Sequence, residues 1–285
     1  MPDFPIIDSH VHLYDIARLR YAWLNAVPRI NRTYLPADFD AARGPVAVDR
    51  IVFAEVAVDP GLHIAEAAFV QELADADVRI AAMIAHAPVE KGAAVEDDLA
   101  ALSRFATLRG IRRLIETERD PGICLEPGFV EGVRRVGRHG LPFDICVKHW
   151  GMVFALELVR RCPDVQFVLD HIGKPGIKFG FREPWWSQIA DLARLPNVVV
   201  KLSGVITEAD HAHWTEAQVT PYVARVIECF GFDRVMYGSD WTVAELTHRY
   251  PDWVAILDRI IAGSSAAEQH ALYRGTASRI YRLDG

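Results

Sequence analysis

The sequence predicts a single-domain α/β protein, a (β/α)8 or TIM barrel that spans residues 1–285. Short apolar runs follow one another along the chain, and most are rich in β-branched residues, as parallel strands covered on both faces require. From the second run onward, the stretches between runs have helical periodicity. Repeated strand–helix units over about 250 residues match a barrel, and a doubly wound open sheet is the alternative.

The order of the expected strands follows from the apolar runs. They are Pro5–Ile7, Ile51–Ala54, Ile80–Ile84, Ile111–Ile115, Phe143–Val147, Val165–Leu169, Val198–Leu202 and Val235–Tyr237. An apolar stripe of Val219, Val223, Val226 and Phe230 predicts one of the helices between them. Two connections, residues 13–48 and 172–186, are too long for simple turns. In a barrel both would lie on the C-terminal face, where active sites are built.

Composition narrows the class of protein. The chain has 31 Lys and Arg against 38 Asp and Glu, a net charge of −7, and 51% hydrophobic residues. This excludes a disordered or collagen-like chain and disfavours a dedicated nucleic-acid binder. No apolar run approaches the roughly 20 residues of a membrane span, and no signal peptide is evident at the N-terminus. The cysteines occur singly, so we expect reduced thiols and a cytoplasmic protein without membrane or nucleic-acid partners.

Polar residues follow most of the expected strands. Because strand ends converge in a barrel, side chains that are distant in the sequence should meet at one mouth. The residues at these ends are His10, His12, Glu55, His86, Arg112, His149, His171, Lys201 and Asp240. Six other histidines fall in helices or outer loops and are expected on the surface: His63, His139, His211, His213, His248 and His270.

The most specific pattern is His10-Val11-His12 at the end of the first strand. Residues i and i+2 of a strand point to the same face, so the two imidazoles can share a metal ion or grip one carbonyl oxygen. Asp240 directly follows the last apolar strand and is the candidate general base, with a helix N-cap as the alternative. His171 follows the sixth strand, with a buried structural histidine as the alternative.

Candidate substrate-binding residues adjoin the same strand ends. Aromatic faces stack on sugars and planar ligands, although they also fill gaps, and one inward arginine could anchor a polar substrate. The set is Arg112, His149, Trp150, Lys174 and Trp241, and the roles of His86 and Glu55 stay open.

Together these segments resemble the amidohydrolase superfamily, and within it the lactonase branch. The matching segments are Asp8-Ser9-His10-Val11-His12-Leu13, Gly110-Ile111-Arg112, Leu169-Asp170-His171-Ile172-Gly173-Lys174-Pro175, Lys201-Leu202-Ser203-Gly204 and Tyr237-Gly238-Ser239-Asp240-Trp241. The branch includes lactonases of L-fuconolactone and L-rhamnonolactone and, more distantly, of 2-pyrone-4,6-dicarboxylate. The resemblance covers residues 6–282.

The resemblance implies a (β/α)8 barrel that hydrolyses a cyclic ester. It assigns the water-activating base to Asp240, and metal or carbonyl binding to His10 and His12 with His171 beside them. Binuclear relatives bridge two metals with a lysine, whereas here the fourth strand carries arginines and Lys148 should face away from His149. The expected cofactor is therefore one divalent ion, most plausibly Zn²⁺ held by His10, His12 and Asp240, which some members dispense with.

The predicted function is the opening of a sugar lactone to its sugar acid in carbohydrate catabolism. Asp240 activates water while the histidines or one divalent metal ion polarise the carbonyl. No Gly-rich phosphate loop is present, so no nucleotide cofactor is expected. Three alternatives stay open: a metal-dependent decarboxylase, a pyrone-dicarboxylate lactonase, and a non-catalytic barrel that binds sugar acids. Sugars are favoured because the fourth strand offers only one inward arginine for a dicarboxylate.

Overall fold

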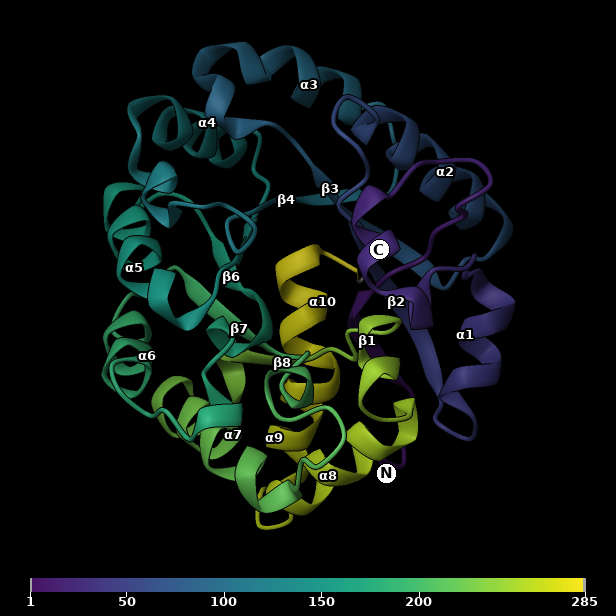
Figure 1. Cartoon of the computed structure of the whole chain (residues 1–285), viewed down its shortest axis with the longest axis vertical. Helices are drawn as coiled ribbons and strands as arrows, with labels where there is room; N and C mark the ends of the chain where they lie inside the picture. The colour runs from purple at the N-terminus through teal and green to yellow at the C-terminus, as the bar shows by residue number, and fades with distance from the viewer. Residues whose placement is uncertain (1, 284–285) are drawn as a thin grey trace.

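The computed structural model describes residues 2–283 and shows eight parallel strands in sequential order. The strands are β1 (Ile6–Val11), β2 (Val48–Ala54), β3 (Ile80–His86), β4 (Leu108–Leu114), β5 (Phe143–Cys146), β6 (Phe167–Leu169), β7 (Val198–Leu202) and β8 (Val235–Tyr237). Each strand pairs with the next in parallel, and helices surround the sheet as an outer ring (Figure 1).

The sheet closes on itself between β1 and the segment that follows β8. Val11 and Trp241 form a parallel bridge across this seam. Two backbone hydrogen bonds flank it, from Asp240 N to His10 O (3.0 Å) and from His12 N to Trp241 O (2.6 Å). The predicted TIM barrel is therefore confirmed.

The helices on the outside are amphipathic, as their sequence periodicity predicts. They are α1 (Pro36–Arg43), α2 (His63–Ala76), α3 (Val95–Leu102), α4 (Pro127–Arg138), α5 (Met152–Arg161), α6 (Trp185–Ala193), α7 (Glu216–Phe230) and α8 (Tyr250–Ile260). In α7 the whole predicted stripe, from Val219 to Phe230, is buried against the barrel.

The first strand differs from its prediction, because β1 continues through Asp8, Ser9 and His10 to Val11. These polar side chains are fully buried, and Ser9 and Asp8 find partners on β8 and α8. Ser9 Oγ donates to Tyr237 O (2.5 Å), and Tyr250 Oη donates to Asp8 Oδ2 (2.9 Å). The apolar run therefore predicted too short a strand, because the polar residues of β1 are buried and form hydrogen bonds with other elements.

The barrel interior is apolar where the C-terminal helix packs against it. Ile7, Val168, Val199 and Met236 form one cluster with residues of α10 (Thr276–Tyr281), which lies after α9 (Ala266–His270) across the middle of the view in Figure 1. The phenol of Tyr281 donates to Asp144 Oδ2 (2.9 Å), the first polar layer above this cluster. The opposite end, where the strands terminate, is left for polar side chains.

Both long connections cover that end, as predicted. In residues 13–48, Trp23 Nε1 donates to Val56 O (2.8 Å), and the Tyr14 hydroxyl lies 3.0 Å from Thr242 Oγ1. These partners follow β2 and β8. The second connection, residues 172–186, packs over the ends of β5 and β6 through His149 and Ile172.

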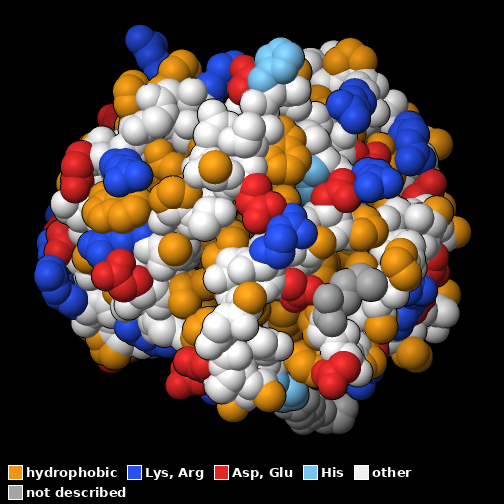
Figure 2. Space-filling view, turned by 90° about the horizontal axis from the view of Figure 1, so that it is seen from below, with side chains coloured by type: hydrophobic (Ala, Val, Ile, Leu, Met, Phe, Trp, Pro, Cys, Tyr) orange, Lys and Arg blue, Asp and Glu red, His pale blue; other side chains and the backbone are white. Residues whose placement is uncertain are grey.

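The four cysteines are unpaired. Within residues 2–283, no helix combines the length and the apolar composition that a membrane crossing needs. On the face seen in Figure 2, acidic and basic side chains are interspersed rather than gathered by sign.

Gly132 in α4 marks the closest helix approach to the chain after β3. A Cβ atom at this position would lie 2.0 Å from the backbone carbonyl oxygen of Val89. We expect Gly132→Ala to destabilise the fold by about 1–3 kcal/mol or more, because backbone must move to admit the methyl group. Thermal unfolding should show a Tm several degrees lower. The control is Gly263→Ala, where an added Cβ meets nothing within 4 Å and the Tm should barely change.

One acid of α2 is buried beside another acid. Glu66 is 1% exposed, and its Oε1 accepts a hydrogen bond from Val56 N (3.2 Å). Burial, reinforced by the charge of Glu55, raises the pKa of Glu66 from 4.5 to about 8. Glu66 therefore keeps its proton in the folded protein at neutral pH.

This proton makes folding stability depend on pH. Between about pH 4.5 and 8 the folded chain holds the proton and the unfolded chain does not, so stability falls as pH rises, by up to about 1.4 kcal/mol per unit. In Glu66→Gln that contribution should vanish, so the variant should gain on wild type as pH rises from 5 to 7 in urea titrations. The exposed Glu72 on the same helix supplies the control, since its pKa is lowered and Glu72→Gln should not change the slope in this window. Parallel pH profiles for Glu66→Gln and wild type would contradict the prediction.

Candidate active site

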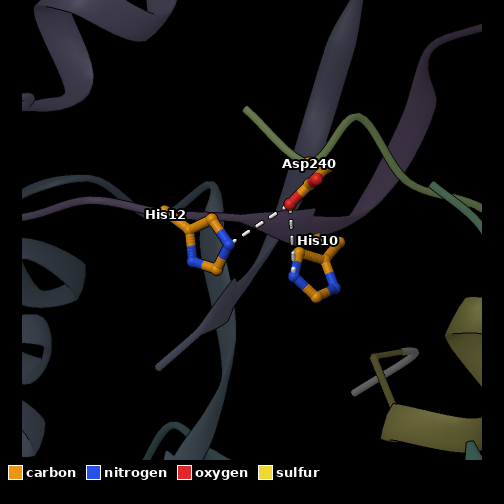
Figure 3. A group of neighbouring side chains, drawn as sticks. All are labelled: His10, His12 and Asp240. Atoms are coloured by element: carbon orange, nitrogen blue, oxygen red, sulfur yellow. Dashed lines mark ion pairs between the residues drawn. The ribbon is translucent and has the colours of Figure 1, made fainter. Parts of the chain in front are cut away.

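Three imidazoles point toward one carboxylate oxygen at the C-terminal end of the barrel. Asp240 Oδ1 lies 3.3 Å from His12 Nε2, 3.7 Å from His10 Nε2 and 3.9 Å from His171 Nε2. Figure 3 shows His10 and His12 reaching the same side of Asp240 from β1. All four residues are buried, with exposed fractions of at most 6%. The structure therefore brings together four of the strand-end residues that the sequence singled out.

Backbone geometry explains how these groups meet. His10 and His12 are two apart on β1 and so share a face of the strand. Asp240 and His171 each have a left-handed backbone, with φ of +58° and +52°. Such conformations cost non-glycine residues about 1–3 kcal/mol and cluster at functional sites. They turn both side chains out of the strand direction toward the barrel axis.

The left-handed conformation continues from His171 through Ile172 and Gly173 to Lys174. Two side chains hold this turn by its carbonyl groups. Trp185 Nε1 donates to Ile172 O (2.7 Å), and His149 Nδ1 lies 3.1 Å from Lys174 O. Trp185 and His149 therefore keep His171 aimed at Asp240.

Glycine is required at position 204, beside the same two groups. Gly204 has φ of +56°, and a Cβ there would lie 2.6 Å from Asp240 Oδ2 and 2.7 Å from His171 Nδ1. The space between the acid and the histidine exists because residue 204 has no side chain.

The hydrogen bond on the far side of the His12 ring sets its protonation. His12 Nδ1 lies 2.9 Å from Ala54 O, and a carbonyl oxygen can only accept, so Nδ1 carries the proton. When Nε2 is unprotonated, its lone pair faces Asp240 Oδ1, an oxygen that accepts no hydrogen bond from the described residues. Two lone pairs directed at each other require a cation between them, either a proton or a metal ion.

These donors fit a metal ion. One ligand atom each from His10, His12 and Asp240 lie within 4.8 Å of one another, and a second such group comprises His10, Asp170 and His171. Imidazole nitrogen and carboxylate oxygen are the usual ligands of Zn²⁺. The orphaned oxygen of Asp240 is where the ion would be bound.

A layer of buried charge lies beneath the histidines. Lys201, fully buried, places Nζ 2.5 Å from Asp144 Oδ2, 3.0 Å from Asp170 Oδ1 and 3.3 Å from His10 Nδ1. Burial raises the pKa of Asp144 to about 6, although Lys201 opposes the rise. Because Lys201 is paired by both acids, its charge can remain inside the barrel.

Arg112 completes this layer from β4. Its Nε donates to Glu55 Oε1 (2.8 Å), and its Nη1 donates to Asp170 Oδ2 (3.0 Å) and lies 3.2 Å from His10 Nε2. Arg112 is only 3% exposed. The geometry therefore favours a supporting role for Arg112 over the substrate anchor that the sequence suggested.

Burial and neighbouring charges shift the pKa values of the histidines and of Asp240. Burial lowers the pKa of His10 well below its usual value, with Lys201 and His171 adding to the effect, and burial likewise lowers the pKa of His171. Burial alone would raise the pKa of Asp240, but His171, His12 and His10 outweigh it and hold that pKa below its usual value. Asp240 is thus an ionised acceptor at neutral pH.

The remaining predicted substrate residues occupy different places. Trp150 is 56% exposed at the rim, with its ring edge against His149. Lys174 Nζ pairs with Glu116 Oε2 (2.7 Å) and lies 3.4 Å from Glu208 Oε1. His149 holds the backbone of the left-handed turn and, within residues 2–283, forms no hydrogen bond or ion pair with Asp240 or His10.

One expectation is corrected, and another stays a prediction. Trp241 is 1% exposed, donates from Nε1 to Glu245 Oε1 (2.9 Å) and packs on Tyr34 and Phe39, and contact between its ring and a substrate stays a prediction. His63 and His248, expected on the surface, are each only 9% exposed. Their positions near helix starts gave no sign of the loops that cover them.

Sequence reasoning placed Lys201 at a strand end and Asp170 beside His171, but assigned neither residue a role in the site. Each was visible as an ionisable residue that interrupts or directly follows an apolar strand, in Val198–Leu202 and after Phe167–Leu169. A buried charge in such a run needs a partner, and that requirement was the available signal.

Comparisons with known proteins agree with this geometry. An L-fucono-1,5-lactonase from Burkholderia multivorans is 32% identical over 97% of this chain and 96% of the relative. An L-rhamnono-gamma-lactonase from Scheffersomyces stipitis is 24% identical over 72% of this chain and 69% of the relative. The crystal structure of an amidohydrolase from Burkholderia multivorans with bound zinc superposes with a TM-score of 0.88 at 30% identity, covering 98% of this chain and 100% of that one. The family model described as amidohydrolase matches residues 7–283, and the chain belongs to this family.

Proposed function

We propose that this protein hydrolyses the ester bond of a sugar lactone, such as an L-fucono-, L-rhamnono- or related aldonolactone. The observation that carries the proposal is the convergence of three imidazole Nε2 atoms on the orphaned Oδ1 of Asp240. A carboxylate and imidazoles together supply both a base and electrostatic stabilisation for acyl transfer to water. The lactonase activity named for two relatives supports the choice of a lactone over another ester.

In this proposal Asp240 is the proton carrier. Its carboxylate accepts a proton from water as the water oxygen bonds to the lactone carbonyl carbon. When the tetrahedral intermediate collapses, the bond to the ring oxygen breaks and protonated Asp240 returns the proton to that oxygen. The product is an open-chain hydroxy acid, which ionises and releases one proton to solution.

The surrounding side chains hold Asp240 ready for this cycle. His171 and His12 face the carboxylate and keep it ionised, while Lys201 and Arg112 place positive charge below His10. Because Asp144, Asp170 and Glu55 pair with these two cations, the layer holds His10 in place, and the histidines are left to stabilise the developing oxyanion.

Bound at His10, His12 and Asp240, a single divalent ion would polarise the carbonyl and lower the pKa of its water toward about 7. Zinc is the ion bound in the related Burkholderia multivorans structure. A second ion is disfavoured, because Asp170 of the second donor group is already engaged by Lys201 and Arg112.

A pyrone dicarboxylate suits this site less well than a sugar. A dicarboxylate needs several cations free to bind it, whereas Arg112 donates to Glu55 and Asp170, and Lys174 pairs with Glu116. A neutral hydroxylated lactone does not require unpaired cations.

Asp240→Asn tests the proton carrier. The amide keeps the shape of the side chain but cannot accept the proton, so kcat should fall 10²–10⁴-fold while KM changes little. Proton release from a sugar lactone, followed with a pH indicator, measures both constants. Asp191→Asn, a change at a half-buried acid that pairs with Arg194 on the outside of the barrel, should keep wild-type rates. If Asp240→Asn retains more than about a tenth of wild-type kcat, the base lies elsewhere.

Metal stoichiometry tests the proposed ion site. Elemental analysis should find no more than one tightly bound divalent ion per chain, and His12→Ala should lose it while His213→Ala retains it. Two ions per chain, or full retention in His12→Ala, would refute the site. Activity after exhaustive chelation then distinguishes carbonyl polarisation by the metal from polarisation by the histidines.

A further inference from the structure

A cavity of about 540 Å³ opens beside the active site, between the loops that follow β2, β3 and β4. Its size is within the usual range for small-molecule sites. The polar side chains that line it include Glu55, Asp59, His63, His86, Lys91 and Arg113.

The cavity adjoins the catalytic histidines through two short connections. Glu55 lines it and accepts from Arg112 Nε, and Arg112 Nη1 in turn lies 3.2 Å from His10 Nε2. Ala54, the residue before Glu55, provides the carbonyl that orients His12 (2.9 Å). Ala54 and Glu55 therefore place this cavity next to the groups that position His10 and His12.

We propose that this cavity is the subsite for the exocyclic, hydroxylated part of the lactone, and that His86 is its specificity-determining residue. The inference rests on the proposed function and deepens it by naming which portion of the substrate is recognised, and where.

The cations of the cavity are already engaged. Arg113 pairs with Glu90 (3.2 Å) and Glu118 (2.6 Å), and Lys91 pairs with Asp98 (2.9 Å). Glu55 and Asp59 are paired as well, with Arg112 (2.8 Å) and Arg20 (2.9 Å), so the described Lys and Arg side chains of the lining leave no unpaired cation for a carboxylate or phosphate. Carboxylate oxygens do accept hydrogen bonds from hydroxyl groups, so a neutral polyol is the chemistry that fits.

His86 is a lining side chain whose ring nitrogens are both available for hydrogen bonds. It packs edge-on against His63, with ring centroids 5.7 Å apart, and makes no hydrogen bond to the residues of the described chain. His63, by contrast, is held by Asp98 Oδ1 (2.8 Å). Burial lowers the pKa of His86, so its neutral ring offers one donor and one acceptor, which a single hydroxyl group can match.

The position of His86 on β3 directs it toward this place. In the parallel register His86 pairs with Arg112 of β4, whose side chain points into the barrel. Paired residues on neighbouring strands lie on the same face of the sheet, so His86 is also directed to the mouth. His86 is the last residue of β3.

Two lactones that differ by one hydroxyl group test the subsite. L-galactono-1,5-lactone carries an exocyclic hydroxymethyl group where L-fucono-1,5-lactone carries a methyl group. We expect His86→Leu to lower kcat/KM for the hydroxymethyl substrate about tenfold relative to the methyl substrate, the loss expected for one hydrogen bond. His86→Gln, which keeps a donor and an acceptor, should restore the ratio to within about threefold, and the exposed His213→Gln should leave it at the wild-type value.

Failure of the subsite and failure of the proposed function give different results. Turnover of both lactones with the same ratio in His86→Leu and wild type overturns the subsite but not the lactonase. If wild type turns over neither lactone, the proposed function fails. Calorimetric binding of both lactones to Asp240→Asn, with and without His86→Leu, then decides the subsite: loss of the preference for the hydroxymethyl lactone supports it, and unchanged relative affinities overturn it.

Discussion

The hydrogen bonds that close the barrel are the constraint on which this site depends. Asp240 N donates to His10 O, and His12 N donates to Trp241 O, so the two ends of the sheet are joined at the residues that carry the candidate chemistry. The left-handed backbone of Asp240 then turns its carboxylate toward both imidazoles. Closing the sheet and assembling the site are the same structural event, and a change at the seam would disturb both.

The buried charges below the histidines connect the apolar interior to this mouth. Lys201, Asp144, Asp170 and Arg112 would be unfavourable singly in the centre of a barrel, but each finds partners that come from other strands across the barrel. Their layer begins where the Tyr281 hydroxyl meets Asp144 and ends at the His10 ring. It gives the imidazoles a fixed electrostatic environment that solvent does not screen.

The two proposals divide the mouth of the barrel between chemistry and recognition. The histidines of β1 and the acid after β8 face one another at the reacting centre, whereas the loops after β2, β3 and β4 enclose a cavity of paired charges. Glu55 belongs to both regions, since it holds Arg112 on one side and lines the cavity on the other. Burial and the negative charge of Glu55 together raise the pKa of the neighbouring Glu66 and keep it protonated.

Local patterns in the sequence were sufficient for the barrel, for the order of its strands and for the candidates His10, His12, His171 and Asp240. Strand and helix periodicities are properties of consecutive residues, and parallel strand ends must converge wherever a sheet closes. Only the tertiary structure decided that Trp241 packs inward, that Arg112 is bound by the acids that directly follow β2 and β6, and that Lys201 lies beside His10. These outcomes depend on which side chains from distant segments become neighbours, and periodicity within one segment carries no information about the partners that will satisfy its buried polar groups.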